Sequence, residues 1–289
     1  MTFYDMPDWI KILLLILTCI SFVPQLYALV RRRGDASGIS PIYVFINLVA
    51  ATELFTISFV ITVNYPEPSS SFTHDPRQLG DWINFANITV IWALWLVIFI
   101  VCIVYYWHEN RSRAAPYVVF YPLLLIISII PVVIDAIANA GQKSDPAFGR
   151  LLLLSSFSWV HLFFLIPLIT LLCLLAAYSQ AREILARPSG SGTGALSVVG
   201  VALQTVVFAV LAATWYPGRL PLTTSNPHFI LWYYVVGFVP VNHAFVALEH
   251  GLLLVAVERH IRRGQDGGEG GSGDDIANVL DETQPLIGS

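Results

Sequence analysis

The chain has 289 residues, of which 56% are hydrophobic and only 12% are charged, and its mean hydropathy is +0.70. Soluble domains carry about a quarter charged residues, so this composition excludes a single water-soluble fold and indicates a protein whose main partner is the lipid bilayer. The net charge of −4 gives no sign of nucleic acid as a partner, because the acids gather in the C-terminal tail and the basic residues flank apolar segments.

Seven long apolar segments follow one another along the chain. A helix needs roughly 20 apolar residues to cross the hydrocarbon core, and backbone groups in hydrocarbon must be satisfied within the segment, which requires helices. The sequence therefore predicts an all-α membrane protein with seven transmembrane helices. The predicted crossings are 9–30, 41–63, 82–107, 117–139, 152–178, 196–215 and 229–256.

The first segment contains a proline followed by a glutamine, Pro24-Gln25, near its C-terminal end. Proline removes a helical hydrogen bond and bends a helix, and Gln25 offers donors and an acceptor beside the freed backbone. Two interpretations stay open, a moving hinge and a static kink with a satisfied amide. A basic turn, Arg31–Arg33, and then Gly38-Ile39-Ser40 lead into the second segment.

The second and fourth segments each carry one acid. Glu53 lies in the middle of its segment, where a charge costs about 3 kcal/mol on the insertion scale and burial favours the neutral acid. Such a group can take a proton from an acidic lumen and release it to a neutral cytosol, or it can be a neutral acid bonded between helices. Asp135 is a second proton-coupling candidate nearer a segment end, where it can instead reach the headgroups.

The seventh segment is the most polar, with Asn242, His243, Glu249 and His250. Residues seven apart share a helix face, but they are separated by about 10.5 Å of rise, so a metal site on this helix is rejected. A proton or solute pathway, with Glu249 for protons and His243 for solute, is one interpretation, and polar contacts between helices are the other. His161, in the fifth segment, is predicted to be a buried hydrogen-bonding residue.

An internal repeat links the two ends of the chain. Gln25 and Gln180 are 155 residues apart, as are Asn87 and Asn242, and residues 37–40 align with residues 194–197. Three crossings reverse the sidedness and one linking helix restores it, which predicts two parallel three-helix bundles joined by a linker helix, a 3+1+3 arrangement. The predicted divisions are a first unit at 1–107, the linker at 108–147, a second unit at 148–258 and a disordered tail at 259–289.

The basic residues predict the orientation. Ten of the fifteen Lys and Arg residues fall in the connections and tail on one side, which places that side in the cytosol, the N-terminus in the lumen and the C-terminus in the cytosol. The tail is rich in Gly and acids, a composition typical of disorder. Glu282, Leu286 and Ile287 resemble an acidic dileucine signal, which would make clathrin-adaptor complexes partners and predicts a vacuolar or lysosomal membrane.

Pro24-Gln25, the basic turn and Gly38-Ile39-Ser40 together resemble the PQ-loop repeat family, which includes lysosomal cystine and vacuolar basic amino-acid exporters and is related in fold to the SWEET sugar transporters. The resemblance implies a 3+1+3 bundle without a cofactor that moves a small polar solute by alternating access, often coupled to protons. It implies hinge roles for Pro24, Gln25 and Gln180, and solute contacts for Asn87 and Asn242. The second unit departs from the pattern, because Ser179 precedes Gln180 where the family has proline.

The leading hypothesis is a proton-coupled transporter of amino acids first and sugars second, with Glu53 among the solute contacts. The chain has no nucleotide-binding loop, nucleophile motif or metal-ligand spacing, so we do not expect an enzyme. Two alternatives stay open. One is a membrane terpene cyclase that uses Glu53 as its acid, and the other is a receptor or scaffold that does not transport.

Overall fold

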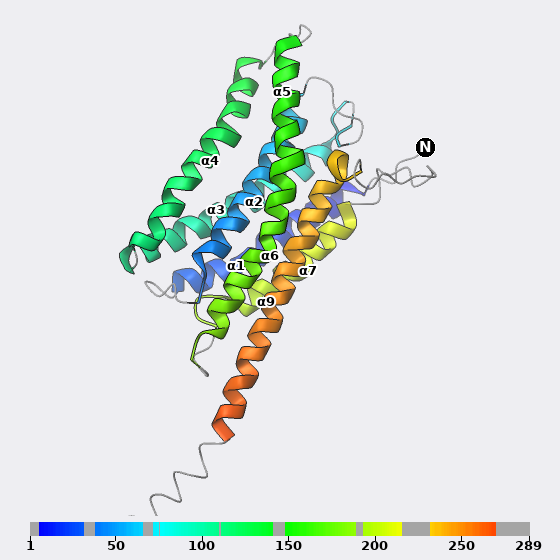
Figure 1. The fold of residues 1–289 in the computed structure, drawn as a ribbon. Coiled ribbons are helices and arrows are strands. Elements are labelled where there is room, and N and C mark those ends of the chain that lie inside the picture. Colours follow the sequence, from blue (N-terminus) through cyan, green and yellow to red (C-terminus); the bar gives the residue numbers. More distant parts are fainter. Residues whose placement is uncertain are drawn as a thin grey trace, which may run out of the picture.

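The computed structural model describes residues 6–31, 38–65, 72–74, 76–109, 111–140, 148–188, 193–215 and 232–269. These residues form a bundle of long helices (Figure 1). Within them, seven helices are long and apolar enough to cross a membrane. The prediction of an all-α protein with seven membrane-spanning segments is therefore confirmed.

The helices follow the predicted segments closely. Three π-helical turns interrupt or extend them: η1 (Val60–Asn64) continues α2, η2 (His161–Leu165) joins α5 to α6 within one crossing, and η3 (Tyr233–Gly237) leads into the last helix. The α-helices are α1 (Asp8–Arg31), α2 (Pro41–Phe59), α3 (Leu79–Glu109), α4 (Arg111–Ala138), α5 (Phe148–Val160), α6 (Ile166–Leu185), α7 (Val198–Trp215) and α9 (Phe238–Glu269).

The last helix is longer than predicted. α9 continues to Glu269, so the prediction of a disordered tail from residue 259 onward is wrong for residues 259–269. Two features of this extension favour a helix: His260 is buried, and Glu258 pairs with Arg262 one turn later, a spacing that stabilises helices. The predicted sorting residues Glu282, Leu286 and Ile287 lie outside the described residues.

Proline positions agree with the local structure. Pro41 is the first residue of α2, after Ser40 in an extended conformation, and a proline at this position costs no hydrogen bond because its missing N–H would have no helical partner. Pro24 lies inside α1 without ending it. In membrane helices neighbouring groups re-satisfy the backbone that a proline frees, so an interior proline is compatible with a continuous crossing.

The packing places one helix at the centre and another at the periphery. In the most apolar stretch of the α2 crossing 83% of residues are buried, against 17% in that of α4. The third helix, α3, packs against both α1 and α2, and α9 packs against both α6 and α7. Two further contacts, α1 with α7 and α2 with α6, join the beginning of the chain to its second half.

Candidate functional site

Two buried glutamines make the same pair of contacts at one end of the bundle, which we name the glutamine end. Gln25 donates from Nε2 to the carbonyl of Ala195 at 3.1 Å, and its Oε1 accepts from the N–H of Ser197 at 2.8 Å. Gln180 donates from Nε2 to the carbonyl of Gly38 at 2.7 Å, and its Oε1 accepts from the N–H of Ser40 at 2.8 Å. Each glutamine therefore ties the helix that carries it to the backbone just before a helix of the other half.

The residues in these contacts are equivalent in the predicted internal repeat. Gln25 aligns with Gln180, and Gly38 and Ser40 align with Ala195 and Ser197. Ser40 precedes α2, and Ser197 precedes α7, where its hydroxyl accepts from the N–H of Gly200 at 3.2 Å. The predicted alignment thus corresponds to one contact made twice, in opposite directions, between the two halves.

The backbones at the glutamine end approach too closely for side chains at Gly38. A Cβ there would lie 2.6 Å from the carbonyl oxygen of Thr193, and Gly38 has φ +89°, a conformation that favours glycine. The neighbouring hydroxyls of Ser40 and Ser179 lie 2.6 Å apart. The residue that stands where the family pattern has proline, Ser179, therefore adds a further contact between the halves.

Glu53 is the centre of a second buried cluster. Its Oε2 lies 2.5 Å from His161 Nδ1, and its Oε1 accepts from the Ser128 hydroxyl at 2.6 Å. The ring of Phe157 stacks on His161, with centroids 4.0 Å apart. The cluster joins α2, α4 and η2, and the prediction that His161 is a buried hydrogen-bonding residue is confirmed.

The Glu53–His161 contact can hold a mobile proton without net charge. A neutral acid beside a neutral imidazole and a carboxylate beside an imidazolium have the same total charge, so moving the proton between them leaves no unpaired charge in the low-dielectric interior. Both side chains are almost fully buried, at 1% and 3% exposure. Loss of that proton would leave the pair with one negative charge, so a single proton decides whether this buried site is charged.

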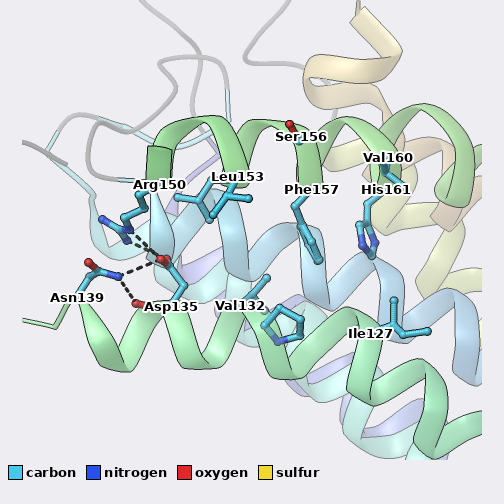
Figure 2. A pocket seen from close by; sticks show the side chains of 12 residues that line it. Ile127, Val132, Asp135, Asn139, Arg150, Leu153, Ser156, Phe157, Val160 and His161 are labelled. Carbon is cyan, nitrogen blue, oxygen red and sulfur yellow. Dashed lines mark hydrogen bonds and ion pairs between the residues drawn. The ribbon is translucent and has the colours of Figure 1, made fainter. Parts of the chain in front are cut away.

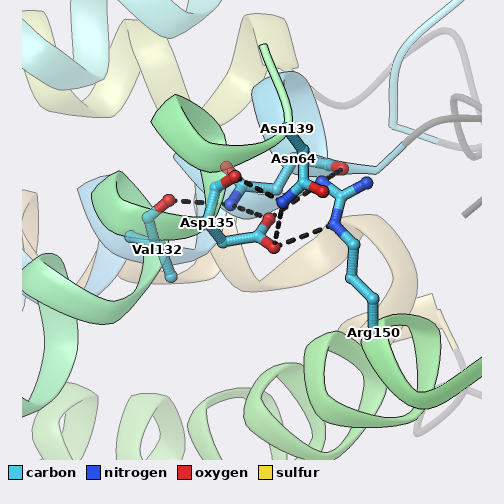
Figure 3. Close-up of polar contacts among 5 residues, drawn as sticks. All are labelled: Asn64, Val132, Asp135, Asn139 and Arg150. Atoms are coloured by element: carbon cyan, nitrogen blue, oxygen red, sulfur yellow. Dashed lines mark hydrogen bonds and ion pairs between the residues drawn. The ribbon is translucent and has the colours of Figure 1, made fainter. Parts of the chain in front are cut away.

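Asp135, the second predicted proton carrier, lies in a different network. Arg150 donates from Nε and Nη2 to the two carboxylate oxygens at 2.8 and 2.9 Å, and Asn64 and Asn139 donate to the same carboxylate at 2.8 and 3.0 Å. Figure 3 shows the three donors around the acid. Rather than reaching toward headgroups by itself, Asp135 binds α4 to the start of α5 and the end of η1, a geometry that favours a structural role.

This ion pair leads to a stability prediction. We expect Arg150→Met to lower the free energy of unfolding by about 2–3 kcal/mol, because it leaves a largely buried carboxylate without its cation. The double variant with Asp135→Leu should recover part of the loss. Thermal unfolding in detergent measures both variants.

Arg262→Met is the matched control. Arg262 and its partner Glu258 are 72% and 58% exposed, so their pair should contribute under about 1 kcal/mol. Equal losses at the two sites would contradict the prediction.

A third polar cluster joins α2 to α9. Asn47 donates to Glu249 Oε1 at 2.7 Å, and the Tyr43 hydroxyl lies 3.1 Å from His250 Nε2. Because His250 Nδ1 lies 2.7 Å from the carbonyl of Val246 and must donate to it, the hydroxyl is the donor to Nε2. The sequence reasoning missed Tyr43 and Asn47, although an amide among apolar residues in the segment of Glu53 was a signal that could have identified Asn47.

The predicted solute contacts are buried but are not joined to Glu53. Within the described part of the chain, Asn87 Oδ1 and both ring nitrogens of His243 have no hydrogen-bond partner. The rings of Phe208 and Trp215 flank His243, with centroids 5.5 and 6.2 Å away. Among these same residues, no hydrogen bond connects Asn87, Asn242 or His243 with Glu53, which instead faces α4 and η2.

A cavity of about 780 Å³ lies between α4 and α5 (Figure 2). Asp135, Asn139 and Arg150 line one end and His161 lines the other. Glu53, Asn87 and Asn242 are not among its lining residues. In the part of the chain that the structure describes, no three metal-ligating side chains gather into a possible metal site.

The comparisons with known proteins found a family match for the N-terminal part of the chain. Residues 7–68 match the family model of the PQ loop repeat, which includes α1, Pro24-Gln25, α2 and Glu53. No curated protein and no solved structure matches the chain. The resemblance predicted from Pro24-Gln25 and Gly38-Ile39-Ser40 is confirmed.

Proposed function

We propose that this chain, a membrane transporter-like protein with a PQ loop repeat at residues 7–68, carries a small polar solute across a vacuolar or lysosomal membrane by alternating access, coupled to protons. The observation that carries the proposal is the reciprocal binding of Gln25 and Gln180 to backbone of the opposite half. Alternating access needs a contact that holds one side closed and can open without unfolding a helix. Side-chain bonds to helix starts meet both conditions.

The helix contacts support two equivalent units. In each half the third helix packs against the first and the second, and the two cross contacts, α1 with α7 and α2 with α6, exchange when the halves are interchanged. Two parallel three-helix units related by a two-fold axis along the membrane normal would give this pattern. In this proposal α4 is the linker and the glutamine end faces the cytosol, an orientation that the distribution of basic residues supports.

The Glu53–His161 pair supports proton coupling. A membrane-buried acid is costly and is usually functional, and here its neighbour is itself a proton acceptor 2.5 Å away. In the proposed cycle the pair takes a proton from the acidic lumen, and the neutralised site favours closure on that side. The second buried acid, Glu249, bonded to Asn47, is the next candidate for this role.

Unpartnered buried atoms support a solute site near Asn87 and His243. A buried polar group without a partner costs about 1–3 kcal/mol, and Asn87 Oδ1 and both nitrogens of His243 are such groups among the described residues. A solute with its own donors and acceptors would recover that free energy. Amino acids rank first because of the proposed address, and sugars second because of the Asn87 and Asn242 pair.

The test is uptake into proteoliposomes. Purified protein is reconstituted with an acidic outer and a neutral inner buffer, and a panel of radiolabelled amino acids and sugars is offered. We expect uptake of at least one solute, lost when an ionophore collapses the pH gradient. Absence of both uptake and counterflow for every solute, with folding confirmed by a cooperative melt, would refute the proposal.

The proposed location depends on the tail. Glu282, Leu286 and Ile287 form an acid followed four residues later by Leu-Ile, the spacing that adaptor complexes bind. Imaging of a fluorescent fusion checks it. If the fusion moves from internal membranes to the cell surface in the double variant Leu286→Ala, Ile287→Ala, the signal is supported. Unchanged internal fluorescence would contradict it.

The alternative functions receive no specific support. A cyclase acid must face its substrate, but both carboxylate oxygens of Glu53 are occupied by His161 and Ser128, and Glu53 does not line the cavity between α4 and α5. No described contact favours a receptor without transport.

A further inference from the structure

The cavity between α4 and α5 has mainly apolar walls and an ion pair at one end. Its walls include Ile127 and Val132 from α4 and Leu153, Phe157 and Val160 from α5. In Figure 2, Phe157 and His161 point from the α5 crossing toward α4, while the Asp135–Arg150 pair lies at the far end. A long apolar slot with a polar group at one end has the polarity of an amphiphile.

The length of the slot matches one leaflet of a membrane. Arg150 and His161 are eleven residues apart on one continuous crossing, which corresponds to about 16 Å of helix rise. Half of a hydrocarbon core that is about 30 Å thick is about 15 Å. Because the crossing begins at Phe148 and runs to Leu185, Arg150 lies near its end and His161 lies deeper along it. The slot therefore runs in the direction in which an acyl chain lies.

The slot opens toward lipid. Ile127, Leu153 and Val160 at its rim are 63%, 73% and 49% exposed, and α4 is the least buried of the crossings. Apolar side chains exposed on the outer face of a membrane protein contact hydrocarbon. The molecule that enters from this side is consequently one already dissolved in the bilayer.

The polar end offers a donor for a phosphate. Arg150 uses Nε and Nη2 for Asp135, and within the described residues the structure assigns no hydrogen bond to its Nη1. Arginine is well suited to phosphate oxygens, and Asp135 already balances its charge, which suits a headgroup with little net charge. We propose that the α4–α5 slot is a binding site for a phospholipid, with one acyl chain in the slot and the phosphate at Arg150.

Such a lipid would have a defined structural effect. The buried chain would fill the space between α5 and the peripheral helix α4, which the Asp135–Arg150 pair joins. It would also cover the faces of the Phe157 and His161 rings that line the slot. Water would then be excluded from that side of the Glu53–His161 pair. This inference does not rest on transport and is measured separately from it.

Photolabelling tests the site. The intact protein is placed in nanodiscs of phosphatidylcholine that contain a small fraction of the same lipid with a diazirine at the end of one acyl chain. After illumination, the expected label lies in the peptides that contain residues 127–132 and 153–161. Leu153→Trp fills the slot and should lower this labelling at least about threefold, a modest factor because packing rather than water exclusion drives association in lipid.

The chain offers matched controls. Leu152 and Ile130 are also exposed, at 56% and 44%, but they do not line the cavity, so Leu152→Trp and Ile130→Trp should label like the original chain. Ile127→Trp, one turn from Ile130, should behave like Leu153→Trp. All four positions face lipid, so folding should be retained, and a melt confirms it. Equal labelling in all variants, or displacement by cholesterol or free fatty acid but not by unlabelled phosphatidylcholine, would overturn the proposal.

Discussion

Glu53→Gln should uncouple solute movement from the proton gradient. A pH difference of one unit is worth about 1.4 kcal/mol per proton, so a gradient of two units can drive about 100-fold accumulation when one proton accompanies each solute. The amide keeps the size of the side chain and an acceptor for Ser128 but cannot change its charge. Gradient-driven accumulation should therefore fall by about two orders of magnitude, while exchange of labelled for unlabelled solute continues.

The direction of the pH effect follows from the same chemistry. In the original chain, acidifying the outer buffer should raise uptake because a steeper inward proton gradient drives each proton-coupled step. In Glu53→Gln the outer pH should have little effect. Accumulation and exchange in proteoliposomes measure the two modes separately.

Two controls make this result specific. Ser128→Ala removes the hydroxyl that donates to Glu53 Oε1 but keeps the acid, so coupling should persist. Glu249→Gln changes the other buried acid, which Asn47 binds. If Glu249→Gln abolishes accumulation and Glu53→Gln does not, the proton site lies on α9 and the assignment to α2 is wrong.

Replacing the two glutamines should open the glutamine end. Methionine is unbranched and similar in length to glutamine, but Gln25→Met strands the carbonyl of Ala195 and the N–H of Ser197, and Gln180→Met strands the equivalent groups of Gly38 and Ser40. Each stranded group costs about 1–3 kcal/mol where it stays buried. A shift of about 2 kcal/mol toward the open form changes its population about 30-fold, and transport should fall more than about tenfold because the closed state is lost.

Cysteine labelling measures this opening. Leu196 is buried beside the contact, so a cysteine placed there in a chain with Cys19→Ser should react slowly with a membrane-impermeant maleimide. We expect Gln25→Met and Gln180→Met each to raise the rate of reaction about 30-fold. The matched control is Gln204→Met, since Gln204 is buried on α7 and its Nε2 has no partner among the described residues. A rise of the same size with Gln204→Met would show that the contact does not hold the end closed.

The sequence predicted the segments and the equivalence of residues better than it predicted their partners. Apolar length located the seven crossings because the hydrocarbon thickness sets that length directly. The alignment of Gln25 with Gln180 and of Ser40 with Ser197 needed only the repeat. Each glutamine binds the opposite half because α1 packs on α7 and α2 packs on α6. No local sequence pattern predicts this packing.

The sequence alone also could not predict which residues bind the buried acids. Burial of Glu53 followed from its place among apolar residues, but Ser128 and His161 come from other crossings and meet it only through their packing against α2. The sequence pattern did not single out Arg150, which lies in the first turn of α5 and binds Asp135. The extension of α9 past residue 259 was missed because composition described the Gly-rich tail as a whole, whereas His260 and Arg262 continue the helix.

Both glutamines at the glutamine end recognise main-chain atoms, at Gly38, Ser40, Ala195 and Ser197. Amide and carbonyl groups are common to nearly every amino acid, so this recognition does not read the identity of a partner side chain. After a gene duplication, such a closure can persist while the two copies drift apart in almost every other position. In units that arise by duplication, backbone contacts of this kind are therefore retained for longer than sequence similarity.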